Sequence, residues 1–193
     1  MSVTAEPLRP THAGPYVAED LDRIPDLPPH TELIDGNLIF VSPQAFFHLL
    51  AINAINSALE RTVPPHLLVA DRMTVRLDEK NRVEPDVLVV DNAALGSILQ
   101  TGFEAADVLL VVEVISPESR TRDRKEKPGR YAAAGIPHFW IVDNIGDKTV
   151  VEVFKLDQDL GSYELVGRFD GAFELEEPFP VALDLWEIDK RRS

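Results

Sequence analysis

The chain has 193 residues, and a single core of that size can bury roughly two thirds of the surface that the unfolded chain exposes, so we expect one domain. An apolar content of 45% excludes wholesale disorder, and the absence of cysteine excludes a disulfide framework and thiolate zinc sites. The 19 basic and 33 acidic residues leave a net charge of −14, which argues against a protein that coats nucleic acid through its overall field.

The N-terminal stretch is rich in proline, which lacks an amide donor and fixes its own φ angle. Six of the 15 prolines fall in the first 29 residues, and we expect residues 1–15 to form a disordered tail and residues 16–193 to form the domain. The stretch has no apolar region typical of a signal peptide, and nowhere do about 18 apolar residues run uninterrupted. The sequence therefore predicts a cytoplasmic protein without a membrane span.

The first predicted elements are a short helix, a tight hairpin and a long helix. The stretch "YVAEDLDRI" suits the short helix. Asp35-Gly36 in "ELIDGNLIFV" predicts a type I′ turn, because both central residues of that turn need positive φ. The segment "QAFFHLLAINAINSALERTV" predicts the principal helix. Its apolar residues at helical spacing include Leu49, Ile52, Ile55 and Leu59. His48 shares this stripe, so a satisfied core histidine is our first interpretation of it and a ligand the second.

The second half of the chain is mainly strands. "LLVADRMTVRLDEKNRVEPDVLVVD" predicts two strands around the polar turn "DEKNR", and "DVLLVVEVIS" is an apolar strand of the kind buried on both faces. A helix follows and ends at "YAAAG", where Gly135 suits the position just after a helix. "HFWIVD" and "TVVEVFKL" are expected to pair across "NIGDK", and "SYELVGRF" adds another strand. This order predicts an α/β (α+β) fold with one mixed central sheet flanked by helices.

Two carboxylates mark the ends of predicted buried strands. Asp86 directly follows a proline and precedes "VLVV", and Glu113 ends the apolar run of residues 108–112. An ionised carboxylate cannot be left unpaired in such a place, because its desolvation costs several kcal/mol or more. Glu113 must therefore meet a cation, a metal or water. Taken alone, Asp86 is equally well explained as a loop carboxylate that makes turn hydrogen bonds.

A basic stretch follows Glu113. Residues 120–130 contain six basic and two acidic residues, a local balance of +4 that leaves −18 for the rest of the chain. A solvated helix face is the usual meaning of such a run, and an anion-binding surface is the sharper alternative. The basic residues are Arg120, Arg122, Arg124, Lys125, Lys127 and Arg130.

Two carboxylates and an ammonium group at adjacent strand ends could hold a hard divalent cation. Mg²⁺ prefers oxygen ligands and commonly uses only one or two protein carboxylates while keeping several waters. Such an ion lowers the pKa of a bound water and neutralises charge on a phosphate under in-line attack. A nearby lysine can orient that water or stabilise the transition-state charge. The reaction suggested is phosphodiester hydrolysis with Mg²⁺ or Mn²⁺ as the cofactor.

Three patterns of the chain resemble a known family. "ELIDGNLIFVSP", "EPDVLVV" and "VVEVISPESRTRDRKEKPGRYAAAGIPHFWIVD" are together similar to the Uma family of restriction-endonuclease-like proteins, a branch of the PD-(D/E)XK nuclease superfamily. The likeness runs from Tyr16 to Asp143. It implies a restriction-endonuclease-like fold and a Mg²⁺-dependent endonuclease that acts on DNA.

The resemblance also implies roles for the two acids. Pro85-Asp86 corresponds to the "PD" of the motif and Glu113 to the second acidic residue, so both would be metal ligands. The backbone carbonyl of Val114 would be a further ligand, since the residue after the acid often has that role in the superfamily. Glu32, before the hairpin turn, is the candidate for an additional acidic residue.

The lysine of the motif is displaced in this chain. The superfamily lysine usually stands two residues after the acid, where this chain has Ile115. The Uma pattern instead places a lysine on the following helix, four residues after an aspartate and four before a tyrosine, and Asp123, Lys127 and Tyr131 have that spacing. Lys127 is therefore the expected water-orienting cation. Tyr131 is an accessory candidate.

The remaining basic residues would bind phosphate. The resemblance implies that DNA lies along one basic edge, and the acidic balance of the rest of the chain would restrict it to that edge. The expected contacts with phosphate are Arg120, Arg122, Arg124, Lys125 and Arg130. His48 is a further accessory candidate for the site.

Pro128, directly after Lys127, departs from what a helix interior allows. A proline there removes a hydrogen bond and clashes with the preceding turn, at a cost of about 3 kcal/mol or more. We therefore predict that the helix begins between Asp123 and Lys127, and that no straight helix is established at Ser119. A kink or a late start could carry the ammonium group of Lys127 away from the site.

Two other functions stay open. A chain that keeps the fold without activity would act by binding DNA or a partner protein, and the acidic balance and Pro128 favour that alternative. A metal site of this kind could also serve a different phosphate ester, such as a nucleotide. A homodimer is expected for a nuclease, because cutting both strands is simplest with two related sites.

Overall fold

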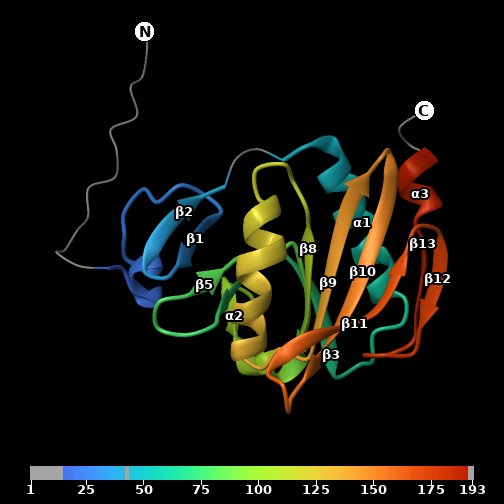
Figure 1. Cartoon of the computed structure of the whole chain (residues 1–193). Coiled ribbons are helices and arrows are strands. Elements are labelled where there is room, and N and C mark those ends of the chain that lie inside the picture. The colour runs from blue at the N-terminus through green and yellow to red at the C-terminus, as the bar shows by residue number, and fades with distance from the viewer. Residues whose placement is uncertain (1–14, 42–43, 191–193) are drawn as a thin grey trace, which may run out of the picture.

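The structure, a computed structural model, describes residues 15–41 and 44–190, so residues 1–14 of the expected tail lie outside the described part. Its centre is a six-stranded sheet of order β11-β10-β9-β8-β6-β3 (Figure 1). Its strands are β3 (Leu67–Asp71), β6 (Val87–Asp91), β8 (Val108–Val114), β9 (His138–Ile145), β10 (Lys148–Asp157) and β11 (Ser162–Phe169). Strands β8 and β9 are parallel, and every other neighbouring pair is antiparallel. The expected mixed sheet and α+β class are confirmed.

Shorter elements lie at both sides of this sheet. A five-stranded sheet has the order β2-β1-β5-β4-β7. Its strands are β1 (Thr31–Ile34), β2 (Asn37–Phe40), β4 (Thr74–Arg76), β5 (Arg82–Val83) and β7 (Gly102–Glu104). At the other side, Figure 1 shows the hairpin of β12 (Ala172–Leu175) and β13 (Val181–Asp184) next to the short helix α3 (Trp186–Asp189). The 3₁₀ turns are η1 (Ala18–Asp22), η2 (Asn92–Ala94) and η3 (Ala105–Asp107).

Helices α1 (Phe46–Glu60) and α2 (Lys127–Ala133) cover opposite faces of the six-stranded sheet (Figure 1). Successive residues of a strand point to opposite faces, and β8 divides its side chains accordingly. Leu110 and Val112 pack in the core on the α1 side, whereas Val111 packs with Tyr131 of α2. Strand β8 is thus buried on both faces, as its apolar sequence predicts. No helix within the described residues is long and apolar enough to span a membrane.

The hairpin and the principal helix form where expected, with one difference. Asp35 and Gly36 both have positive φ, 50° and 75°, and they join β1 to β2. Of the four apolar residues that predicted α1, Ile52, Ile55 and Leu59 are buried, whereas Leu49 is half exposed and its neighbour Leu50 is buried. Leu49 therefore lies at the edge of the apolar stripe.

Residues 67–91 form four strands, although two were expected. Arg72 breaks the first run with a positive φ of 51°, and the chain passes from β3 in the large sheet to β4 in the small one. Between β5 and β6 it returns to the large sheet, where Pro85 has no amide hydrogen to donate to a ladder. The sequence pattern reveals neither passage between the two sheets, because the alternation of apolar and polar residues continues on both sides of Arg72 and of Pro85.

A π-helical turn precedes α2, which the sequence did not predict. Thr121 already has helical angles, φ −67° and ψ −43°, and a π-helical turn, η4 (Arg122–Glu126), precedes α2. The N–H of Lys127 reaches back five residues to the carbonyl of Arg122. The α-helix itself begins at Lys127, within the predicted range, with Pro128 in its first turn, and Ser119 lies in a turn and not in a straight helix. We infer that the wider π turn shifts the hydrogen-bond register and so accommodates a residue without an N–H.

Candidate active site

Asp86 is held at the start of β6, beside the end of β8. The two strands are antiparallel and pair Val87 with Val112, so the residue before β6 faces the last residues of β8. Asp86 Oδ2 accepts a hydrogen bond of 2.7 Å from the backbone N–H of Val114. The N–H and C=O of one strand residue point to the same side, so the Val114 carbonyl also faces Asp86.

Glu113 is buried at the same end of β8 and finds two partners on the helical segment. Its Oε1 accepts a hydrogen bond of 2.9 Å from Lys127 Nζ and one of 2.5 Å from the Tyr131 hydroxyl. Both partners are themselves buried. The buried strand end therefore does meet a cation, as its desolvation cost demands.

Lys127 reaches the site despite Pro128. Its ammonium group is buried and lies 2.8 Å from Glu32 Oε1, 2.9 Å from Glu113 Oε1 and 3.3 Å from Asp123 Oδ1. The concern that a late or kinked helix would carry the lysine away is therefore unfounded. The π turn changes where the helix begins but leaves the side chain of Lys127 directed at the end of β8.

Glu32 comes from β1 of the small sheet, next to the hairpin. Its Oε1 also accepts the backbone N–H of Glu84 at 3.0 Å, and its Oε2 lies 3.5 Å from Arg122 Nε. Oε2 is buried without a hydrogen-bond partner, as is Asp123 Oδ1. Glu32 thus lies in the cluster, its role as an additional acid stays a prediction, and the cluster retains acceptor capacity.

His48 contacts Asp86 and is not simply a core residue. Its Nε2 lies 3.0 Å from Asp86 Oδ1, so the N–H of Val114 and the imidazole of His48 together fix both oxygens of that carboxylate. A second histidine–carboxylate pair lies nearby, with His30 Nδ1 2.5 Å from Glu84 Oε1. His30 has a positive φ of 60°, which is uncommon for a residue with a side chain.

Burial and charge set the protonation of the cluster. Burial raises the pKa of Glu113 well above its usual value, and the charges of Asp123, Asp86 and Glu32 reinforce the shift against the opposing charge of Lys127. Burial alone would lower the pKa of Lys127, but the charges of the surrounding carboxylates outweigh it and raise that pKa well above normal. Lys127 therefore stays a cation, and Glu113 is the carboxylate that burial and its acidic neighbours push towards the protonated form.

The other members follow the same balance. Burial would raise the pKa of Glu32, but the charge and hydrogen bond of Lys127 outweigh burial and lower it. Asp123 keeps a raised pKa because burial exceeds the stabilisation by Lys127. Burial, and then the charge of Glu113, raise the pKa of Tyr131 well above its usual value, so its hydroxyl remains a donor to that carboxylate.

The donor set suits a hard divalent ion. Four carboxylates of the cluster, from Glu32, Asp86, Glu113 and Asp123, face two cations, Lys127 and Arg122, which leaves a formal deficit of two positive charges. No group of three or more histidine and acidic side chains among the described residues has the arrangement of a complete metal cage. Mg²⁺ does not need one, because it commonly binds through one or two carboxylates and keeps its waters.

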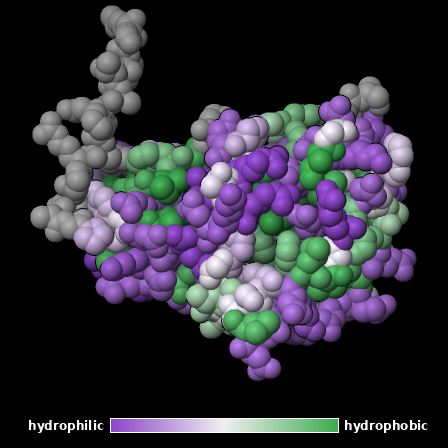
Figure 2. Space-filling view, viewed as in Figure 1, coloured by the Kyte–Doolittle hydropathy of each residue, from purple (hydrophilic) through white to green (hydrophobic). Residues whose placement is uncertain are grey.

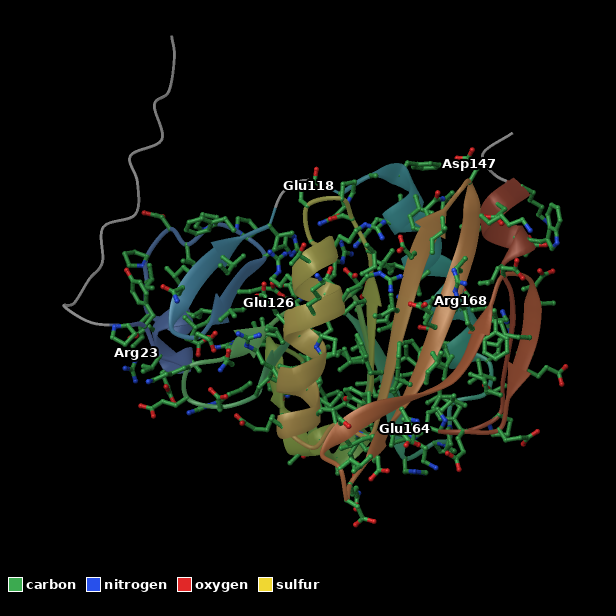
Figure 3. The ribbon with its side chains drawn as sticks, viewed as in Figure 1. Arg23, Glu118, Glu126, Asp147, Glu164 and Arg168 are labelled. Atoms are coloured by element: carbon green, nitrogen blue, oxygen red, sulfur yellow. The ribbon has the colours of Figure 1, made fainter. Side chains whose placement is uncertain are left out.

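Most of the basic stretch is engaged in ion pairs within the protein. Arg120 forms a bidentate pair with Asp143, and Arg124 bridges Asp143 and Glu152 at 2.8 and 2.7 Å. The exposed side chains of Glu118 and Glu126, labelled in Figure 3, lie on the same segment.

The other cations of the stretch differ in exposure. Arg130 lies 2.5 Å from Asp35, while Lys125 is exposed. The face that the helical segment covers in Figure 1 is largely hydrophilic in Figure 2. Phosphate binding by this stretch stays a prediction, and Lys125 is an exposed cation of the stretch.

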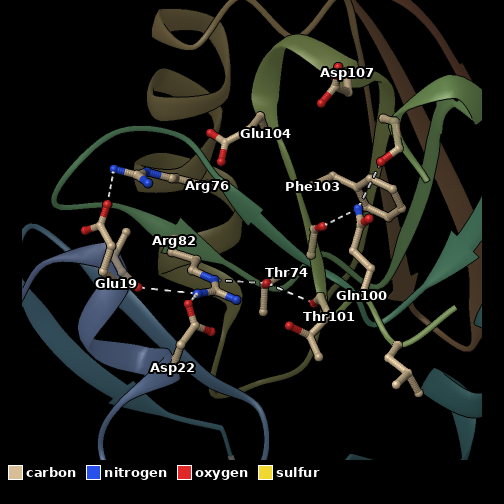
Figure 4. Close-up of a pocket in the computed structure, with 14 residues that line it drawn as sticks. Glu19, Asp22, Thr74, Arg76, Arg82, Gln100, Thr101, Phe103, Glu104 and Asp107 are labelled. Carbon is tan, nitrogen blue, oxygen red and sulfur yellow. Dashed lines mark hydrogen bonds and ion pairs between the residues drawn. The ribbon is translucent and has the colours of Figure 1, made fainter. Parts of the chain in front are cut away.

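A cavity of about 620 Å³ opens beside Asp86. It is lined by Asp86, Glu84 and His30 and by residues at the start of α1, among them Phe46 and His48. A different cavity of about 480 Å³ lies over the small sheet, where Arg76 pairs with Glu19 and Arg82 with Asp22 (Figure 4). No candidate catalytic residue lines that second cavity.

Sequence reasoning missed Asp143 and His30. Asp143 is buried at the end of the apolar run "HFWIVD", the same signal that singled out Glu113, and could have been found that way. His30 has no comparable signal, because its place depends on a turn between prolines and on a partner 54 residues away.

A family model decides the relationship of the chain. The model of Uma2, described as "Putative restriction endonuclease", matches residues 18–186. The chain belongs to the Uma2 family. The motif resemblance is thereby confirmed, and this chain is a member of a restriction-endonuclease-like nuclease family.

One solved structure agrees with this fold. A putative nuclease belonging to DUF820 from Anabaena variabilis is similar with a TM-score of 0.68 and 15% sequence identity, covering 91% of this chain and 98% of that one. NucC of P. aeruginosa in its cAAA-bound form has a TM-score of 0.37 and 11% identity, covering 65% of this chain and 85% of that one. A comparison with curated proteins gives no match. At these identities the likeness of the first structure shows the fold.

Proposed function

We propose that this Uma2 chain is a metal-dependent endonuclease that hydrolyses DNA phosphodiester bonds with Mg²⁺ or Mn²⁺. The observation that carries the proposal is the contact of 2.9 Å between Lys127 Nζ and Glu113 Oε1, at the strand end where Asp86 is held against Val114. This contact supports the idea that the helical segment supplies the cation of the site. The strand itself has Ile115 at the position where the superfamily motif has its lysine.

Asp86, Glu113 and the carbonyl of Val114 would hold the ion. When bound, the ion would activate a water and neutralise charge on the phosphate under attack. Asp86 is oriented for that role because His48 and the Val114 N–H fix its two oxygens. Glu32 is an accessory acid that keeps Lys127 in place from the opposite sheet.

Lys127 would act as a charge and not as a base. Its pKa is raised well above normal, so it carries no lone pair at physiological pH. A compact ammonium group beside the reacting phosphate can orient the attacking water and stabilise charge that develops in the transition state. Tyr131 would limit the charge on Glu113 by donating its hydroxyl to it.

A second candidate is a chain that keeps the nuclease fold but binds DNA or a protein without cutting. The contacts of Lys127 with three carboxylates favour it, since they leave the ammonium group enclosed by the protein. We also propose a homodimer for the active form, because two related sites suffice to cut both strands.

The decisive experiment is cleavage of supercoiled plasmid in Mg²⁺ or Mn²⁺ by the wild type, Asp86→Ala and Lys127→Ala. Lys148→Ala is the matched control, since Lys148 is an exposed lysine outside both the candidate site and the basic stretch. We expect cutting by the wild type and the control alone. Cutting that survives both site substitutions would contradict the assignment, and DNA binding without any cutting would support the second candidate.

A further inference from the structure

Two large apolar side chains stand exposed beside the candidate active site. Phe46 and Leu49 are 67% and 50% exposed, and both line the cavity of about 620 Å³ that Asp86 also lines. They lie three residues apart in the first turn of α1 and so share one side of that helix. The face that α1 packs on the sheet uses other residues, such as Ile55 and Leu59.

The lining of the cavity combines apolar and polar side chains. Val41, Ala45 and Ile52 line it together with Phe46 and Leu49, and Asp86, the candidate metal ligand, lines it as well. A ligand that fits this lining has a flat, uncharged face for Phe46 and Leu49.

A nucleotide has this chemistry. Its base is planar, and base–aromatic stacking tolerates any base because every base has a π face. The volume of about 620 Å³ is that of a site for one small molecule, in the range of roughly 300–1,000 Å³, and not of a groove for a duplex. Asp71, Glu84 and Asp86 outnumber Arg72 on the lining, so a run of phosphates would be repelled there while an uncharged base would not.

We propose that Phe46 stacks against the base of the nucleotide next to the cleaved phosphate, with Leu49 beneath it, so that the substrate is DNA with an unpaired base at the cut. This inference rests on the proposed function and names its substrate class. In an intact duplex both faces of a base are covered by its neighbours, so only a single strand, a flap, an end or an extruded base offers a free face.

The test uses the full chain and two DNA probes, a single strand of mixed sequence and the duplex of the same sequence. Binding is measured by fluorescence anisotropy in Ca²⁺, an ion that also takes oxygen ligands. Phe46→Ala should weaken binding of the single strand about tenfold, and Phe46→Trp should restore it. Trp186→Ala is the matched control, because Trp186 is 66% exposed and lines neither cavity described above.

Stacking is read directly with 2-aminopurine placed in the single strand. Its fluorescence should be quenched on binding to the wild type and to Phe46→Trp, and not on binding to Phe46→Ala. In cleavage assays Phe46→Ala should raise KM for the single strand while leaving kcat unchanged. Circular dichroism shows whether each variant is folded. We expect all of them to fold, because Phe46 and Trp186 are both exposed.

The outcomes separate this inference from the proposed function. If the wild type cuts DNA but Phe46→Ala binds and cuts as the wild type does, the stacking site is refuted and the nuclease stands. If nothing is cut yet single-strand binding depends on Phe46, the stacking site stands and the nuclease is refuted. Equal affinity for duplex and single strand, or binding of neither, refutes the stacking site.

Discussion

Lys127 Nζ lies 2.9 Å from Glu113 Oε1 although 14 residues separate the two along the chain, and the intervening segment contains a π-helical turn. The two groups are buried together with Glu32, Asp123 and Tyr131. Removing one member of such a cluster leaves the others charged and desolvated, which is more costly than losing an exposed pair. Stability and chemistry are therefore coupled at this site.

Lys127→Met should destabilise the fold by about 3 kcal/mol or more, because three buried carboxylates then lack their shared cation. Denaturant unfolding measures the change. Adding Glu113→Gln removes one of the uncompensated charges, so the double variant should lose about 1 kcal/mol less than the sum of the single losses. If the two losses of unfolding free energy add strictly, the contact of 2.9 Å does not couple the two residues energetically.

Metal binding should stabilise the chain through Asp86. At a Mn²⁺ concentration of about 100 times Kd, the unfolding free energy should rise by about 2.7 kcal/mol and Tm by about 5–10 °C. Asp86→Asn should abolish this rise. Asp71→Asn, which removes an acid from the same cavity, serves as the control and should keep it. An equal rise in Asp86→Asn would remove Asp86 from the set of ligands.

His48 is expected to act by positioning Asp86. His48→Leu should weaken Mn²⁺ binding about 10–100-fold, as substitution of groups that orient a ligand commonly does. Excess metal should then restore cleavage. His30→Gln alters the neighbouring histidine–carboxylate pair and should leave the Kd for metal unchanged. Isothermal titration provides both values, and a purely structural role for His48 would lower stability without changing metal affinity.

The basic stretch should divide into structural and DNA-binding cations. Arg124→Ala removes hydrogen bonds to two carboxylates, one of them the buried Asp143, and should cost about 1–3 kcal/mol of stability. Lys125→Ala should change stability by less than about 0.5 kcal/mol. It should, however, reduce the slope of log K against log salt for DNA binding by about 1. An unchanged slope would exclude a phosphate contact by Lys125.

His138 should make the fold sensitive to mild acid. Burial, aided by the charge of Lys155 against that of Glu177, lowers its pKa below the usual value of 6.5. The unfolded chain then binds more protons below about pH 6.5, so stability should fall as the pH drops through that value. His138→Gln should remove this part of the loss. Glu113, whose raised pKa acts in the opposite sense, is common to both proteins, so the difference between their unfolding free energies isolates His138.

Local patterns predicted much of the fold. The Asp35-Gly36 turn, the helix from 46 and the doubly buried strand β8 each depend on neighbours in sequence, and each formed where predicted. The crossings at Arg72 and Pro85 were not predictable, because a change of sheet leaves the apolar alternation intact. The π turn before Lys127 was not predicted. The sequence showed only that Pro128 does not fit the interior of a regular helix.

The sequence by itself determined that Glu113 needs a cation, a metal or water as a partner, since a carboxylate at the end of an apolar strand cannot be left unpaired. The resemblance to the Uma pattern, which Asp123, Lys127 and Tyr131 match in spacing, identified Lys127 as the candidate. Only the tertiary structure decided that Glu32 would share that lysine and that Asp143 would claim the nearby arginines. Electrostatic partners in a buried site are selected by distance and desolvation in three dimensions, and neither quantity can be read from the order of residues along the chain.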